Sequence, residues 1–211
     1  MSNMKKILAG LPLLALAACA PATTIKTYVD PSVNRAVVAE GGVTVLPVLL
    51  GAAVKDANIP ELRRELAKRT GDSVQKYFPT AKIVRFEQTV ESLESNGLMD
   101  GFTSTATAFD ATGILKADTI NKLLDKIGTR YALLPYLQST SATASGSGLY
   151  YTVTYNAAFS MVLWDKNQSK VVYEGSGRSA SASGLFKNIN ILDAVYAAFD
   201  NAGAKLVSDL K

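Results

Sequence analysis

The sequence INKLLDKIGTRYALLPYL, residues 120–137, places a helix, its cap and a strand in immediate succession. Its first apolar residues share one helix face through i, i+3, i+4 and i+7 spacing: Ile120, Leu123, Leu124 and Ile127. Gly128 follows at the position where helices often end. The apolar run Tyr131–Leu137 comes next and is typical of a strand covered on both faces. A helix that leads directly into a buried strand predicts an α/β fold.

Two further strand candidates lie upstream of this stretch. The run VTVLPVLL, residues 43–50, is apolar throughout, but Pro47 has no N–H to donate, so we expect an edge or a break there. A helix opens with capping-box spacing at Asn58 and Glu61 and continues to Phe78, before a short strand over 82–86 and a helix over 87–98. This order predicts three parallel strands joined by right-handed crossovers.

Downstream, the pattern changes to the period of two that marks a half-buried strand. Apolar residues alternate with more polar ones over 152–163, Asp165–Ser169 supplies a turn, and 170–180 returns as an antiparallel partner. Asn190 and Asp193 then open a helix with this apolar stripe: Val195, Phe199, Ala202, Leu206 and Leu210. We therefore predict an α/β sandwich of two or three layers around a mixed sheet of about five strands. It comprises three parallel strands with crossover helices, an antiparallel hairpin and a C-terminal helix.

The N-terminus carries a different signal. Lys5 and Lys6 precede the apolar run 7–18, which is shorter than the roughly 20 residues of a membrane-crossing helix and ends in small residues before Cys19. This segment resembles a bacterial lipoprotein signal peptide. The resemblance implies cleavage before Cys19, a diacylglycerol on its thiol and an acylated amino terminus; Ala20 implies sorting to the outer membrane. An uncleaved anchor or an ordinary secretory signal is the alternative.

These observations divide the chain into three parts. We expect a lipoprotein signal peptide at 1–18, a lipidated N-terminus with a short tether at 19–40, and a single periplasmic α/β domain at 41–211. The tether is rich in Pro and Thr, and 36–39 is its one strand candidate. A flexible coil of that length averages about 25 Å, so the domain would stay close to its membrane.

Composition excludes several function classes. Without residues 1–18, 20 basic and 18 acidic side chains remain and form no basic stripe, which argues against nucleic-acid binding. Histidine is absent and the one cysteine is assigned to lipid, so triad hydrolysis, thiol catalysis and the usual zinc sites are excluded. We expect no metal, no cofactor and no enzyme. The remaining catalytic candidates are Glu87, Glu91 and Glu94 on one helix face, a spacing that a solvated acidic face shares.

The predicted topology also places a candidate binding surface. The carboxyl ends of three parallel strands share one edge, where the loops 51–57, 87–90 and 139–148 would gather. The hairpin would bring the Ser- and Ala-rich segment 178–184 beside 139–148. We expect a polar, partner-binding surface there, with plain solvated loops as the alternative. Its candidate residues are Lys55, Asp56, Ser141, Thr143, Arg178 and Ser181.

Three stretches carry a wider resemblance: the opening strand 43–47, the helix end and strand 125–134, and the hairpin 163–175. They resemble the periplasmic α/β domain shared by the TolB amino-terminal domain, the lipoprotein activator of penicillin-binding proteins and the curli secretion lipoprotein. Members of this group mostly bind proteins or assemble into envelope machines. The resemblance implies a non-enzymatic lipoprotein that is anchored to a bilayer by acyl chains and binds an envelope protein to assemble or regulate a complex.

Two alternatives from other classes stay open. In the hairpin 149–180, the aromatic residues Tyr150, Tyr151 and Trp164 bracket the alternating strand. This strand is longer than the roughly 10 residues that a membrane strand needs, which would suit an oligomeric pore or a secretion-channel subunit. The acidic helix face would instead suit a carboxylate-based cell-wall hydrolase.

Overall fold

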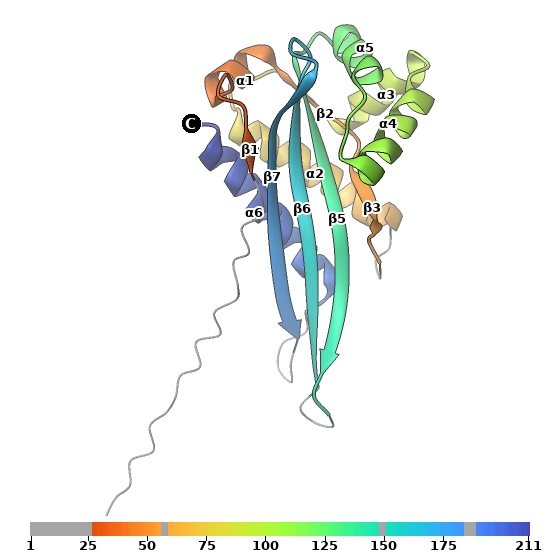
Figure 1. The fold of residues 1–211 in the computed structure, drawn as a ribbon, viewed down its shortest axis with the longest axis vertical. Coiled ribbons are helices and arrows are strands. Elements are labelled where there is room, and N and C mark those ends of the chain that lie inside the picture. The colour runs from red at the N-terminus through yellow and green to blue at the C-terminus, as the bar shows by residue number, and fades with distance from the viewer. Residues whose placement is uncertain (1–26, 56–58, 148–150, 184–188) are drawn as a thin grey trace, which may run out of the picture.

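The computed structural model describes residues 27–55, 59–147, 151–183 and 189–211, and a mixed sheet lies at its centre (Figure 1). The strands in these ranges are β1 Tyr28–Val29, β2 Val43–Val45, β3 Leu49–Ala53, β4 Ile83–Val84, β5 Tyr131–Ser145, β6 Thr152–Asp165 and β7 Lys170–Ser183. The helices are α1 Arg35–Gly41, α2 Ile59–Tyr77, α3 Phe86–Ser95, α4 Met99–Thr112, α5 Ala117–Ile127 and α6 Ile191–Asp209. None of these helices has the length and apolarity that a membrane crossing requires.

The described strands form one seven-stranded sheet in the order β1-β7-β6-β5-β2-β4, with β3 also paired to β5. Strands β2, β4 and β5 are parallel, which confirms the three predicted parallel strands. The run 43–50 breaks at Pro47 as expected. Val45 is paired with Leu133 and Leu49 with Tyr136, so β2 and β3 both follow β5 with one extra residue between them. The prediction of about five strands was too low, because it missed β1 and took β2 and β3 as one.

The antiparallel part of the sheet is longer than predicted. Strand β5 continues to Ser145 and β7 to Ser183, and both pair along their length with β6. The segment 139–145, which we predicted as part of a loop, and the segment 181–183, which lies beyond the predicted end of the returning strand, are therefore strands. Their small polar side chains suggested loops, but backbone pairing with β6 fixes the extended conformation.

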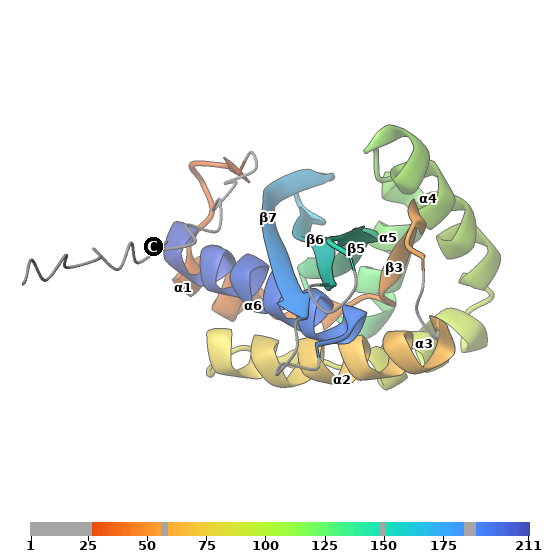
Figure 2. The ribbon, with the colours of Figure 1, turned by 90° about the horizontal axis from the view of Figure 1, so that it is seen from below.

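Helices cover the two faces of the sheet and make it a three-layer sandwich. Figure 2 shows α2 and α6 on one side of the sheet and α4 and α5 on the other. On the first side, Phe159, Met161 and Leu163 of β6 share one buried apolar cluster with residues of α2 and α6. On the second side, Val162 and Trp164 share a cluster with residues of α3, α4 and α5. Both faces of β6 are therefore buried over 157–165, so the prediction of a half-buried strand was wrong for this part.

Two elements lie in the segment that we assigned to the tether. Strand β1 pairs antiparallel with β7, and α1 occupies 35–41, so the strand candidate at 36–39 was wrong. Lys170 of β7 holds Asp30 in an ion pair of 2.7 Å, which ties this segment to the sheet. The chain thus joins the fold at Tyr28, and Cys19 lies outside the described residues.

Helix α4 was not predicted from the sequence either. Its sequence, MDGFTSTATAFDAT, has an unbroken run of Thr, Ser and Ala over 103–108 and few large apolar side chains. Phe102, Thr105 and Phe109 are nevertheless buried on one face. Phe102 and Phe109, two helical turns apart, join the buried cluster that α3 and α5 form with the sheet, and this burial fixes the helix there.

Candidate functional site

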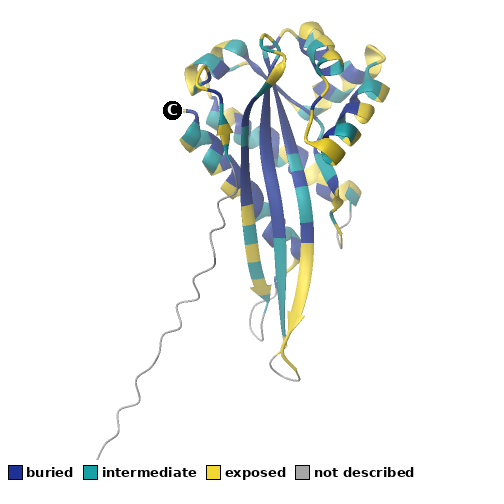
Figure 3. Cartoon of the chain, in the orientation of Figure 1, coloured by how far each residue is buried: buried dark blue, intermediate teal, exposed yellow. Residues whose placement is uncertain are grey.

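Three of the predicted binding residues come together on one end of the long strands, and a fourth lies on the opposite face. We call this end the ribbon extension and define it as residues 139–145 of β5, 152–158 of β6 and 178–183 of β7. Its tip extends past the helices, α6 lies behind its inner part (Figure 1), and much of β5 in it is exposed (Figure 3). Across the strands, Ser141 is paired with Asn156 and Asn156 with Ala180.

The ribbon extension presents two different faces. Side chains alternate along each strand, so Ser141, Thr143 and Arg178 share one face by their register with β6. Ser181 is paired with Tyr155, which packs toward the core on the α6 side. The predicted single surface is therefore corrected to one polar face with Ser141, Thr143 and Arg178, and Ser181 behind it.

Lys55 lies at the root of the ribbon extension. Its backbone N–H donates to the Thr140 hydroxyl at 2.7 Å, and that hydroxyl donates to the Lys55 carbonyl at 2.7 Å. The side chain of Lys55 is exposed. Its backbone thus fixes the end of β3 to β5, and the neighbouring Asp56 lies outside the described residues.

Both outer strands of the ribbon extension have open edges within the part of the chain that the structure describes. Strand β1 pairs with β7 only at Tyr173 and Glu174, and β3 pairs with β5 no further than Ser139. Beyond these points no described strand covers β7 or β5 on the outer side. Helix α6 caps one carbonyl, because the Asn201 side chain donates to the Arg178 carbonyl at 2.9 Å. Open strand edges present unpaired backbone groups that another strand can use.

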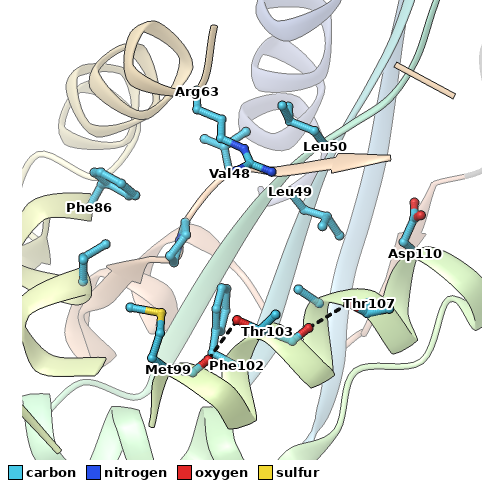
Figure 4. Close-up of a pocket in the computed structure, with 13 residues that line it drawn as sticks. Val48, Leu49, Leu50, Arg63, Phe86, Met99, Phe102, Thr103, Thr107 and Asp110 are labelled. Atoms are coloured by element: carbon cyan, nitrogen blue, oxygen red, sulfur yellow. Dashed lines mark hydrogen bonds between the residues drawn. The ribbon is translucent and has the colours of Figure 1, made fainter. Parts of the chain in front are cut away.

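A second feature is an apolar groove at the carboxyl ends of β2 and β4 (Figure 4). It has a volume of about 440 Å³. The chain leaves the β2–β3 segment toward α2 on one face of the sheet and leaves β4 toward α3 on the other. Such a divergence is where α/β sheets commonly bind ligands. The lining residues are Pro47, Val48, Leu49, Leu50, Arg63, Phe86, Val90, Met99, Phe102, Thr103, Ala106, Thr107 and Asp110.

Most polar side chains of the groove already have partners. The hydroxyls of Thr103 and Thr107 each donate to the carbonyl four residues earlier, both at 3.0 Å. Asp110 accepts from the Tyr136 hydroxyl at 2.6 Å and from the Ala52 N–H at 3.3 Å. Burial, reinforced by this bond to Asp110, raises the pKa of Tyr136 above its usual value. Among the described residues, the Arg63 guanidinium has no hydrogen bond or ion pair.

The sequence indicated the edge of the sheet but not the groove. Helix α4 supplies about half of the lining, and that helix was not predicted. The usable signal was the pair Phe102 and Phe109, spaced by two helical turns.

The acidic candidates lie elsewhere. Glu87, Glu91 and Glu94 are all exposed on α3, as a solvated helix face would be. Within the described ranges, no cluster of three His, Cys, Asp or Glu side chains could hold a metal ion.

Comparisons with known proteins give fold neighbours only. No protein-family model and no curated protein matches the sequence. Lipoprotein GNA1162 from Neisseria meningitidis is 18% identical, with 78% of this chain and 99% of that chain covered at a TM-score of 0.43. A PelC dodecamer from Paraburkholderia phytofirmans is 9% identical, covering 88% and 95% at 0.45. The LpoB C-terminal domain from Escherichia coli is 14% identical, covering 71% and 97% at 0.36. A likeness of this degree carries no argument about function, which has to be derived from the chain's own residues.

Proposed function

We propose that this chain is an outer-membrane lipoprotein, anchored through acylated Cys19, whose periplasmic domain is not an enzyme and binds an envelope protein through the ribbon extension. The observation that carries the proposal is the ribbon extension itself. Among the described residues, its strands have two open edges, and the face opposite α6 carries the small, exposed side chains of Ser141 and Thr143.

A strand-lined partner site fits this surface physically. Long open edges favour unwanted pairing, and proteins usually shorten, charge or cover them. In the described part of the chain, β7 is open from Gly175 to Ser183, with Arg178 as its one charged side chain. A partner strand could pair with such an edge through its backbone, while the side chains on alternate positions provide specificity. Ser141 and Thr143 are small enough for a partner to approach the sheet face closely.

The position of Tyr28 limits how far the domain can lie from the membrane. The chain joins the sheet at Tyr28, nine residues after Cys19. Nine residues span at most about 30 Å when fully extended. An acylated Cys19 would therefore hold the domain next to the bilayer, and its partner would be a membrane protein or one bound close to the membrane surface.

Site-specific photocrosslinking in cells tests the partner site. A photoreactive amino acid is placed at Ser141, Thr143 or Arg178, and the matched control position is Glu94, an exposed residue of α3. We expect one adduct of discrete mass from the ribbon positions and none from Glu94. Absence of ribbon adducts, or equal adducts from Glu94, would contradict the proposal. Adducts at multiples of the chain's own mass would indicate an assembly of copies instead.

Metabolic labelling tests the anchor separately. Radiolabelled palmitate should enter the wild-type chain and should not enter the Cys19→Ser variant, which should also leave the outer-membrane fraction. Multiple acyl chains anchor stably because each buried methylene contributes about 0.8 kcal/mol. Label in the Cys19→Ser variant, or an unchanged fraction, would reject lipidation at Cys19.

A further inference from the structure

We propose that the groove between β3, α3 and α4 binds an anionic amphiphile, a molecule with a long aliphatic chain and one negatively charged head. This site is separate from the ribbon extension and does not depend on acylation of Cys19. Three observations support it: the size and lining of the groove, a cation at its side that has no partner among the described residues, and the engagement of its other polar side chains.

The groove has the dimensions and the surface of a ligand site. Its volume of about 440 Å³ lies in the range of about 300–1,000 Å³ that is common for small-molecule pockets. Phe86, Met99 and Phe102 supply large apolar surfaces from α3 and α4, and Leu49 faces them from β3 (Figure 4). Methionine adapts its shape readily, which suits a flexible aliphatic chain.

One unpartnered charge defines the head group. Arg63 extends from α2 over the groove beside Val48 and Leu49 (Figure 4). Its guanidinium has no ion pair or hydrogen bond with the described residues. The other charged lining residue is Asp110. Its carboxylate accepts hydrogen bonds from the Tyr136 hydroxyl and the Ala52 N–H and forms no ion pair with Arg63. A guanidinium binds carboxylate or phosphate with charge-assisted hydrogen bonds, so the groove complements a negative head on an apolar body.

The same polar inventory favours an aliphatic chain over a peptide. A bound peptide would bring N–H and C=O groups into an apolar space, and each would need a partner. The groove hydroxyls of Thr103 and Thr107 already donate within α4, and Asp110 is engaged. Methylene groups need no partners. The shared chemistry fits a free fatty acid or the acyl chain and phosphate of a phospholipid.

Photoaffinity labelling of the full-length chain tests the site. The protein is purified in detergent, transferred to an amphipol, and irradiated with a diazirine-bearing palmitate; the matched probe is the corresponding palmityl alcohol. We expect the carboxylate probe to label peptides from 86–110 about tenfold more than the alcohol does. That ratio corresponds to about 1.4 kcal/mol, close to the lower value for a hydrogen bond to a charged group. Competition with oleate and with phosphatidylglycerol distinguishes the two sources of ligand.

Variants separate the apolar groove from the charged contact. Ala106→Phe should fill the groove and reduce labelling by both probes, and Thr103→Phe, at an exposed lining position, provides a second blocking variant. Arg63→Gln should reduce carboxylate labelling to the level of the alcohol, whereas Arg64→Gln, at its exposed neighbour, should not. Circular dichroism verifies that each variant is folded.

Each contrary outcome overturns a defined part. Labelling that maps outside 86–110, or that survives both blocking variants in folded protein, would reject the groove as the site. Equal labelling by carboxylate and alcohol, with no effect of Arg63→Gln, would reject the anionic head. Displacement of the probe by an apolar peptide but not by oleate or phosphatidylglycerol would reject an amphiphile as the ligand.

Discussion

The two halves of the long strands β5, β6 and β7 differ in burial and in composition, although they belong to the same strands. In the half nearer the β6–β7 turn, β6 carries Phe159, Met161 and Leu163, all fully buried. In the ribbon extension the same strands carry mainly Ser, Thr and Ala and are largely exposed or half-exposed. The pairing of β6 with β7 nevertheless runs from Val153 to Leu163 without a shift in register. Between β6 and β7 the exposed half thus keeps the register of the buried half. Between β5 and β6 the register shifts by one residue at the boundary, between Leu137 and Ser139.

A chain of hydrogen bonds marks the boundary between the halves. Gln138 of β5 donates to the Ser160 hydroxyl at 2.7 Å, and the Ser160 and Ser176 hydroxyls lie 2.6 Å apart. Ser160 and Ser176 are buried although they are polar. These hydrogen bonds cross all three strands on the face opposite α6. The buried polar groups at the boundary between the core half and the ribbon extension are therefore paired.

The largest effect is expected from breaking the core half. Phe159→Ala removes a ring that packs edge-to-face on Phe199 at 5.2 Å between centroids, and it should lower the free energy of unfolding by about 3–5 kcal/mol. Thr143→Ala, on the same sheet but exposed, should change it by less than about 0.5 kcal/mol. Urea unfolding measures both. Similar losses from the two variants would contradict a division of stability between the halves.

The next effect concerns the buried carboxylate at the far end of the core half. Asp165 is fully buried, accepts two hydrogen bonds from Arg130 at 2.9 and 2.6 Å, and also accepts from Gln168 and the Asn167 N–H. Burial opposes its ionisation, but these bonds and the charge of Arg130 outweigh burial and hold the pKa of Asp165 below its usual value. The carboxylate therefore stabilises the fold in its charged form.

Asp165→Asn should lower the free energy of unfolding by about 3 kcal/mol near neutral pH, because it leaves Arg130 without its anion. The sign of the pH effect is set by the lowered folded-state pKa. The contribution is complete above the unfolded value of about 4 and is lost as the pH falls through the lower folded-state value. Unfolding followed from pH 7 to pH 2 should show a steeper acid loss in the wild type than in Asp165→Asn. Parallel curves would mean that Asp165 does not contribute this charge-dependent stability.

The sequence predicted the helices and strands that bury large apolar side chains. It did not predict the elements whose conformation depends on strand pairing or on close packing of small residues. The run at 131–137, the alternation in 152–163 and the stripe on α6 all identified their elements, because burial selects such residues. Helix α4 and the outer strands of the ribbon extension carry mainly small or polar residues, and β1 is only two residues long. The conformation of these segments comes from neighbours that are remote in sequence. The groove was missed for the same reason, since α4 forms one wall. The sequence does not distinguish Arg63 from the other exposed charges of α2, because its place beside Val48 and Leu49 depends on the tertiary fold.

Close approach also explains the glycine at the start of the ribbon. Gly177 is paired with Phe159 and faces α6, where a Cβ would overlap the Ala198 carbonyl oxygen and the Ala202 nitrogen. Gly177→Ala should therefore push α6 away from β7 and lower the free energy of unfolding by about 2 kcal/mol. Ala180→Val, at an exposed position of the same strand, is the matched control. A neutral Gly177→Ala would show that α6 can shift without loss, and the contact at this boundary would then be loose.

The smallest change in stability is expected from the N-cap of α6, and it tests whether the two halves of the long strands open separately. Asn190 begins α6 by accepting from the N–H groups of Leu192 and Asp193 at 2.9 and 3.2 Å, and Asp193 accepts in return from the Asn190 N–H. Asn190→Ala should lower the free energy of unfolding by about 1 kcal/mol. Leu192 and Tyr155 both pack at the edge of the α6-side core, so fraying of the first turn of α6 exposes the ribbon before the core half. Amide hydrogen exchange should accordingly rise at 153–157 and stay unchanged at 159–163. Equal acceleration in both segments would mean that the two halves of the strands open as one unit.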